Sequence, residues 1–275
     1  MTPIRFAARA AIVGVLALPF ASHAAITDFT DNGSAADILD TVDAYRAALG
    51  ALNPNNGSSF GSGRREINWD AVPDTFSDPN LLPGNFFNQT TPGGRARGAQ
   101  FSTPGTGFLL SADSSNITGT STMFGFAGSG LGPFSQERIF SPIGSVITAV
   151  DFFVPAQPGV AATTRGFGAV FIDADRAISK MDYYGVNGGL LHSILVPSGT
   201  FSFAGVLFND AVVARVVITA GDAALLGNGN FGPGTDGVVM DDFFYGEPVP
   251  VPEPSTWAML LVGLAGLGLG LRRRR

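Results

Sequence analysis

Apolar and polar positions follow a helical period near the start of the chain and a strand period over most of the remainder. Four apolar side chains recur at spacings of three and four, which places them on one helical face: Ile38, Val42, Tyr45 and Leu49. Ser34 is a suitable N-cap with Asp37 three residues later, and Gly50 is a suitable stop. The pattern therefore predicts a helix over residues 35–49.

Short apolar segments separated by turn residues follow from Gly98 onward. Asn187-Gly188 lies between two of them and is a strong β-hairpin signal, because both residues accept positive φ. The predicted strands cover residues 99–101, 107–111, 123–126, 145–154, 167–172, 180–184, 190–196, 201–208, 212–219 and 238–244. Successive strands without a helical pattern between them predict an all-β domain, an antiparallel two-sheet sandwich of jelly-roll type.

Composition supports a β-rich body and restricts its partners. Charged residues make up 14% of the chain, where ordinary globular chains have about 25%. The 16 basic and 22 acidic residues give a net charge of −6. Because six arginines lie in the two terminal segments, residues 25–271 hold 10 basic and 22 acidic residues, a net charge of −12. Such a body should repel nucleic acid and anionic lipid.

The N-terminal segment has the three parts of a secretory signal. Arg5 and Arg9 form a positive region, an apolar run covers residues 10–21, and small residues at Ser22 and Ala24 mark a cleavage site. We expect a signal peptide over residues 1–24, cleaved after Ala24 by the Sec pathway. The alternative is an uncleaved N-terminal anchor, for which the apolar run is short.

The C-terminal segment contains three features in a fixed order. Pro252-Glu253-Pro254 comes first, an apolar run follows, and Arg272, Arg273, Arg274 and Arg275 come last. Residues 257–271 would form a helix about 22 Å long, shorter than the roughly 30 Å hydrocarbon core of a bilayer. Four arginines favour a cytoplasmic C-terminus. The segment is therefore predicted to be a short transmembrane helix that serves as a weak permanent anchor.

This ordered trio resembles the PEP-CTERM family of sorting signals. The resemblance implies that exosortase, a membrane protease-transferase, recognises Pro252, Glu253 and Pro254, cleaves nearby and releases the protein outward. It also implies a Gram-negative bacterium that produces extracellular polysaccharide, and a role for Arg272 to Arg275 in orientation. The body is similar to uncharacterised domains that precede such tails. The alternative is a plain C-terminal membrane anchor.

Few side chains in the body can carry catalysis. The chain has no Cys, which excludes cysteine nucleophiles, thiolate zinc sites and iron–sulfur clusters. His192 is the one histidine beyond the signal peptide, and its strand pattern predicts a position on a solvated face. Trp69, Tyr183, Tyr184 and Tyr245 would form a sugar platform if exposed, but packing in the core is the favoured interpretation.

Carboxylates are the remaining candidates for chemistry. Adjacent strand residues point to opposite faces, so Asp241 and Asp242 can face one site only across a bulge. Jelly-roll carbohydrate-binding modules often share a structural calcium between a last-strand Asp and an N-terminal acid. By that analogy Asp28 and Asp242 are candidate calcium ligands. Ordinary turn and strand-end acids are the simpler interpretation.

These features divide the chain into six parts. They are a signal peptide (1–24), an N-terminal extension with a helix and irregular loops (25–97), a β-sandwich core (98–246), a Pro-rich linker with the sorting motif (247–256), a short transmembrane segment (257–271) and a basic cytoplasmic tail (272–275). Alternating prolines predict that the linker is an extended spacer.

The sequence therefore predicts a non-enzymatic exported protein of the cell surface or extracellular matrix, with a body that binds glycan or is structural. The expected partners are the Sec export machinery, exosortase and extracellular polysaccharide, and not nucleic acid. Two alternatives stay open. One is a secreted carboxylate-dependent hydrolase acting on polysaccharide, and the other is a permanently anchored periplasmic protein.

Overall fold

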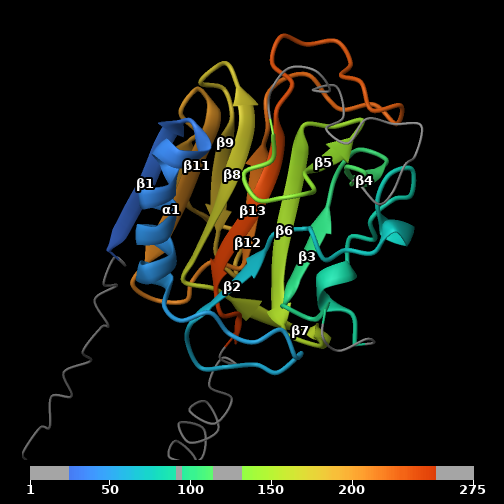
Figure 1. Cartoon of the computed structure of the whole chain (residues 1–275). Coiled ribbons are helices and arrows are strands. Elements are labelled where there is room, and N and C mark those ends of the chain that lie inside the picture. The colour runs from blue at the N-terminus through green and yellow to red at the C-terminus, as the bar shows by residue number, and fades with distance from the viewer. Residues whose placement is uncertain (1–24, 91–94, 114–131, 252–275) are drawn as a thin grey trace, which may run out of the picture.

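The computed structural model describes residues 25–90, 95–113 and 132–251, which form two β-sheets packed face to face with one α-helix outside (Figure 1). This confirms the predicted antiparallel two-sheet sandwich. The predicted signal peptide 1–24, strand 123–126 and transmembrane segment 257–271 lie outside the described residues. Within the described part of the chain, no helix is long and apolar enough to cross a membrane.

Sheet A has seven strands in the order β1, β11, β8, β13, β5 and β4, with β2 also paired to β13. They are β1 (Ile26–Gly33), β2 (Arg64–Ile67), β4 (Gly107–Leu110), β5 (Phe140–Ile143), β8 (Gly166–Ala174), β11 (Gly199–Phe208) and β13 (Val239–Gly246). Neighbouring strands are antiparallel. Strand β13 is buried at every position, which is unusual for an antiparallel strand and shows that both of its faces are covered.

Sheet B also has seven strands, in the order β10, β9, β12, β6, β7 and β14, with β3 paired to β6. They are β3 (Ala99–Ser102), β6 (Ile147–Val154), β7 (Gln157–Thr163), β9 (Lys180–Tyr184), β10 (Leu190–Leu195), β12 (Arg215–Thr219) and β14 (Val249–Pro250). In β12, Val216 and Ile218 are buried, whereas the residues between and beside them are partly or fully exposed. This alternation shows that sheet B has one face in the core and one toward solvent.

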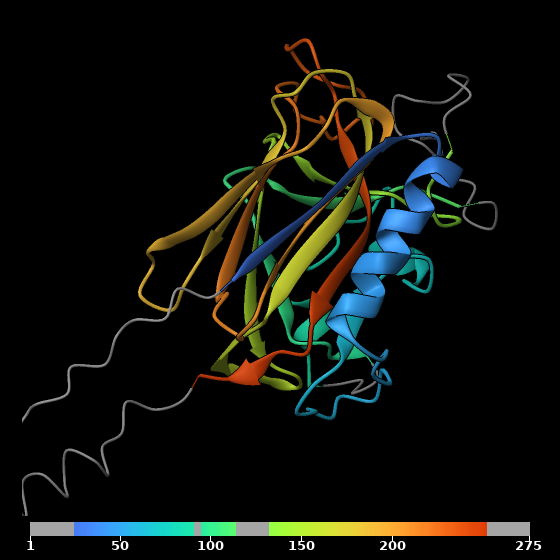
Figure 2. The ribbon, with the colours of Figure 1, turned by 90° about the vertical axis from the view of Figure 1, so that its left-hand side faces the viewer.

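Helix α1 (Ala35–Leu49) covers the outer face of sheet A (Figure 2). Its bounds match the prediction, and a capping box between Ser34 and Asp37 begins it. The four predicted apolar residues are all buried. The Tyr45 hydroxyl donates a hydrogen bond of 3.0 Å to the carbonyl oxygen of Val206. Gly168 and Gly205 leave room for the Tyr45 ring, because a Cβ at either position would lie within about 3 Å of it.

Aromatic side chains fill the space between the sheets. Trp69 stacks on Phe140 with ring centroids 4.4 Å apart and contacts Phe243 edge-on at 5.1 Å. Trp69, Tyr183 and Tyr245 are at most 1% exposed, which confirms the packing interpretation for these three, while Tyr184 is half-buried. Two 3₁₀ helices, Asp74–Phe76 and Phe86–Asn88, bring further rings into this core.

Several strands were missed by sequence analysis because they lack a strong apolar alternation. Strand β1 is an exposed edge with mixed Thr and Asp, β5 contains a proline, and β7 is mostly exposed. Both β1 and β2 belong to residues 25–97, so this segment is an integral part of sheet A as well as a carrier of the helix. Long-range pairing therefore overrode weak local preference.

The beginning of the Pro-rich linker packs against the body. Strand β14 pairs with β7, and the Val251 amide donates a hydrogen bond of 3.2 Å to the Ala161 carbonyl oxygen. Glu247 is 3% exposed. Residues 247–251 are thus part of the folded domain, and the spacer predicted for residues 247–256 does not begin before residue 252.

Candidate functional site

A β-bulge in β13 places two adjacent carboxyl groups on one face of sheet A. Met240 pairs with Phe171 of β8, and Phe243 pairs with Ala169. Asp241 and Asp242 therefore lie opposite a single residue of β8, Val170. Met240 and Phe243 both face the core between the sheets. The two aspartates between them therefore both point to the outer face, which sequence analysis allowed only across a bulge.

Both carboxyl groups bind the segment that precedes β5. Asp241 Oδ2 accepts hydrogen bonds from the backbone amides of Phe134 (2.6 Å) and Ser135 (3.2 Å). The Ser135 hydroxyl lies 2.7 Å from Asp242 Oδ1 and 3.4 Å from Asp70 Oδ2. The Asp70 carboxylate also accepts a hydrogen bond of 3.1 Å from the Arg138 amide. Three carboxyl groups from two distant parts of the sequence thus meet at Ser135.

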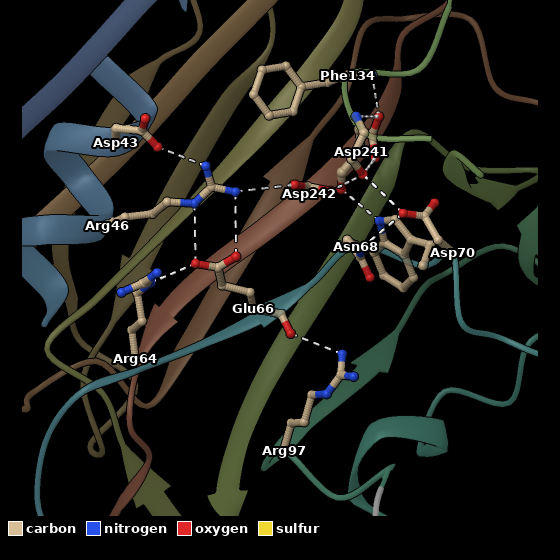
Figure 3. A network of polar contacts seen from close by, with 12 residues as sticks. Asp43, Arg46, Arg64, Glu66, Asn68, Asp70, Arg97, Phe134, Asp241 and Asp242 are labelled. Carbon is tan, nitrogen blue, oxygen red and sulfur yellow. Dashed lines mark hydrogen bonds and ion pairs between the residues drawn. The ribbon is translucent and has the colours of Figure 1, made fainter. Parts of the chain in front are cut away.

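An ion-pair network joins this cluster to helix α1 and strand β2 (Figure 3). Arg46 Nη2 of α1 lies 3.7 Å from Asp242 Oδ2, and Arg46 Nε lies 3.2 Å from Glu66 Oε1. Arg64 Nε contacts the same Glu66 oxygen at 2.6 Å. The guanidinium of Arg46 also lies 4.6 Å from the centre of the Phe244 ring. The network therefore fixes the helix on the sheet beside the bulge.

Burial changes the acidity of this carboxyl cluster. It raises the pKa of Asp241 well above the ordinary value, and the neighbouring Asp242 carboxylate raises it further. Burial also raises the pKa of Asp242 to about 6, against the opposing effects of the Ser135 hydrogen bond and the Arg46 charge. The pair thus retains a proton to a higher pH than isolated carboxyl groups do.

This pKa rise predicts how stability depends on pH. A carboxyl group with a pKa near 6 in the folded state and about 3.9 in the unfolded state stabilises the fold fully below about pH 4. That contribution is lost as the pH rises through 6. Asp242→Asn has no such group to titrate and therefore does not lose this contribution. We expect the difference in free energy of unfolding, variant minus wild type, to become more positive by about 2 kcal/mol between pH 4 and pH 7.

Urea titrations at a series of pH values measure this difference. Asp222→Asn is the matched control, because hydrogen bonds from Thr235 lower the pKa of Asp222. Its difference from wild type should stay nearly constant between pH 4 and pH 7 and change in the opposite direction only below about pH 4. If the difference in free energy of unfolding between Asp242→Asn and wild type stayed constant from pH 4 to pH 7, the burial of the Asp242 carboxyl group would be contradicted.

The candidate calcium ligands do not come together. Asp28 lies on edge strand β1 and Asp242 on β13, with β11 and β8 between them. At about 4.8 Å per strand, this separates the two residues by roughly 14 Å. Asp28 instead pairs with His192 of sheet B, Nε2 to Oδ1 at 2.9 Å. The two aspartates therefore do not fit a shared calcium site, and the described residues contain no cluster of three or more acids or histidines suited to a metal.

In the described part of the chain, the carboxyl cluster connects β13 to the segment before β5 and to helix α1. Asp241 and Asp242 are 0% and 3% exposed, and their oxygens accept hydrogen bonds from the protein itself. Sequence analysis identified both aspartates, but Ser135 and Arg46 were missed. The available signal was the pair of acids inside an apolar strand, because buried charges require partners.

The predicted sorting residues Pro252 to Pro254 and Arg272 to Arg275, like the predicted cleavage residue Ala24, lie outside the described residues. Comparison with known families identifies their region directly. The family model of the PEP-CTERM protein-sorting motif matches residues 250–275. The chain therefore carries a PEP-CTERM sorting motif, as the ordered trio predicts. The motif supports an exported protein that is sorted through exosortase and associated with the membrane or surface.

Comparisons of the whole chain add little about the body. No curated protein sequence matches it. A glycoside hydrolase family 43 arabinoxylan arabinofuranohydrolase from Bacillus subtilis, solved with cellotetraose, is 17% identical over 52% of this chain and 24% of its own, with a TM-score of 0.25. The enzymatically active domain of bacteriophage CBA120 tailspike protein 4 is 14% identical over 66% of this chain and 21% of its own, with a TM-score of 0.26. The matched regions cover about a quarter of the first protein and a fifth of the second, and neither likeness indicates an activity.

Proposed function

We propose that this protein is a non-enzymatic β-sandwich that is exported by Sec, processed by exosortase and delivered to the cell surface or extracellular matrix. Its body either binds glycan or serves as a structural component there. The observation that carries the proposal is the PEP-CTERM sorting motif at residues 250–275. The net charge of −12 over residues 25–271 is consistent with a place away from nucleic acid.

The end of the folded body suits cleavage within the motif. Strand β14 ends at Pro250, and Val251 makes the last described backbone hydrogen bond before Pro252. Cleavage at or beyond Pro252 would therefore remove no residue of the described sandwich. The released protein would keep both sheets and the buried Glu247.

The non-enzymatic assignment is supported by how the acids are used. Asp241 and Asp242 are buried and bound to Phe134 and Ser135, and a hydrolase would need its carboxyl pair in contact with substrate. Loss of polysaccharide hydrolysis in Asp241→Asn or Asp242→Asn, with the fold retained, would contradict this assignment.

Replacing Pro252, Glu253 and Pro254 together with Ala tests the sorting proposal. We expect this variant to accumulate as a full-length species in the membrane fraction, while the wild-type protein is released, because exosortase would no longer recognise the motif. Fractionation followed by immunoblotting measures the distribution. Pro248→Ala, outside the matched motif, is the control and should be released normally. Release of the triple variant as efficiently as wild type would contradict exosortase processing.

A further inference from the structure

Two arginines of this acidic protein have no carboxylate partner among the described residues and lie in the same pocket. Within residues 25–90, 95–113 and 132–251 there are nine arginines, and six of them form ion pairs. The remaining three are Arg95, Arg97 and Arg165. Arg95 and Arg97 line one surface pocket of about 120 Å³ together with Asn68 and Trp69. None of the described residues that line this pocket is Asp or Glu, although acids outnumber bases in the chain.

Aromatic rings hold both guanidinium groups in place. The Arg95 guanidinium lies 4.4 Å from the centre of the Phe86 ring and 5.3 Å from that of Phe76. The Arg97 guanidinium lies 5.0 Å from the centre of the Phe87 ring. Stacking uses the face of a guanidinium and leaves its in-plane N–H groups available as donors. The pocket therefore presents oriented donors and two positive charges.

Much of this donor capacity is unused in the described part of the chain. Arg97 Nη1 donates a hydrogen bond of 2.9 Å to the Glu66 carbonyl oxygen (Figure 3), but its buried Nε has no partner among the described residues. Arg95 makes no hydrogen bond or ion pair to the described residues beyond its ring contacts. Arg95 therefore has unused donors for an added anion, and Arg97 contributes its positive charge from the same pocket.

We propose that this pocket binds the carboxylate of an acidic sugar residue within a glycan. This proposal rests on the proposed surface or matrix function and names a ligand class for it. Arginine forks match the geometry of a carboxylate and form charge-assisted hydrogen bonds with it. Sites for drug-sized ligands occupy about 300–1,000 Å³, so this pocket admits the carboxylate while the sugar ring stays outside.

The net charge of the whole body restricts the class of ligand further. Residues 25–271 carry a net charge of −12, which repels densely charged polymers over a distance of about 8 Å at physiological salt. A single carboxylate on an otherwise neutral chain escapes most of this repulsion. The pocket is thus suited to a glycan with widely spaced uronate residues rather than to nucleic acid.

Isothermal titration of the full chain in non-ionic detergent tests the proposal with two matched ligands. The probe is a disaccharide of glucuronate and glucose, and cellobiose, which carries a hydroxymethyl group in place of the carboxylate, is the neutral ligand. We expect the acidic disaccharide to bind at least about tenfold more tightly than cellobiose. We expect Arg95→Gln and Arg97→Gln each to weaken that binding by about tenfold, since each removes charge-assisted donors.

Arg215→Gln removes the same charge from an exposed ion pair with Asp151 on sheet B and should leave binding unchanged. Arg95→Gln is the decisive variant, because Arg95 makes no hydrogen bond to the described residues and its loss should leave the circular dichroism spectrum intact. Equal weakening by Arg215→Gln, equal binding of cellobiose, or no binding at all would overturn the proposal. Acetate or phosphate binding as tightly as the disaccharide would also overturn it, by showing an anion site without sugar recognition. None of these results depends on how the tail is processed, so a failure here is distinct from a failure of the sorting proposal.

Discussion

Replacing Glu247 with Gln is expected to lower the free energy of unfolding by about 3–5 kcal/mol. Glu247 Oε2 lies 2.5 Å from Arg65 Nε, and both side chains are at most 1% exposed. The same carboxylate accepts hydrogen bonds from the Asn53 side chain (2.8 Å) and the Phe60 amide (3.0 Å). The variant leaves the Arg65 charge buried without a counter-charge, which is far more costly than losing an exposed pair.

A urea titration followed by circular dichroism measures this effect, with Asp151→Asn as the matched control. The control makes the same carboxylate-to-amide change in the exposed Arg215–Asp151 pair and should cost less than about 1 kcal/mol. Similar small losses in both variants would show that Glu247 is hydrated in solution. The result bears on function, because Glu247 fixes the end of the sandwich five residues before Pro252.

Replacing Trp69 with Ala is expected to lower the free energy of unfolding by about 3–5 kcal/mol. The indole is 1% exposed, stacks on Phe140 and contacts Phe243, so its removal leaves a cavity between the sheets. Its Nε1–H also donates a hydrogen bond of 2.7 Å to the carbonyl oxygen of Asp241 at the bulge. The variant therefore loses packing and leaves a buried carbonyl without its donor.

The half-buried Tyr184 on sheet B is the comparison for Trp69, and Tyr184→Ala should cost about 1 kcal/mol. Thermal and urea unfolding of both variants give the two values. If the Trp69 variant were no less stable than the Tyr184 variant, the central position of Trp69 would be wrong.

Elements with strong local signals could be predicted from the sequence. Residues 35–49 combine a capping residue, a four-residue apolar face and a terminal glycine, and the helix has the predicted bounds. Apolar segments such as those of β6, β8, β11 and β13 were predicted as strands for the same reason. The exposed edge strand β1 has no such pattern, and it becomes a strand because eight of its residues pair with β11.

The site could be predicted only in part. Asp241 and Asp242 were recognised as unusual, but the bulge that turns both to one face arises from pairing with β8 and has no local sequence signal. The proposed partnership of Asp28 with Asp242 failed because β11 and β8 lie between their strands. The pocket of Arg95 and Arg97 depends on rings from the two 3₁₀ helices, Asp74–Phe76 and Phe86–Asn88, and the spacing of these residues did not reveal it.

The structure and the sorting motif fit one sequence of events. The buried Arg65–Glu247 pair and strand β14 keep the end of the body folded up to Val251. The matched motif begins at residue 250, so the proposed recognition residues Pro252 to Pro254 follow directly. Processing there would release a complete sandwich whose carboxyl cluster and arginine pocket are unchanged.

The intact mass of the protein from culture supernatant and from membranes tests the central claim most directly. The account predicts a supernatant species that begins near Ala25 and ends within residues 252–256, which establishes both signal cleavage and exosortase processing. A full-length species ending in Arg275 and found only in membranes would contradict it. In that case the tail would be a permanent anchor, and the body would work in the periplasm.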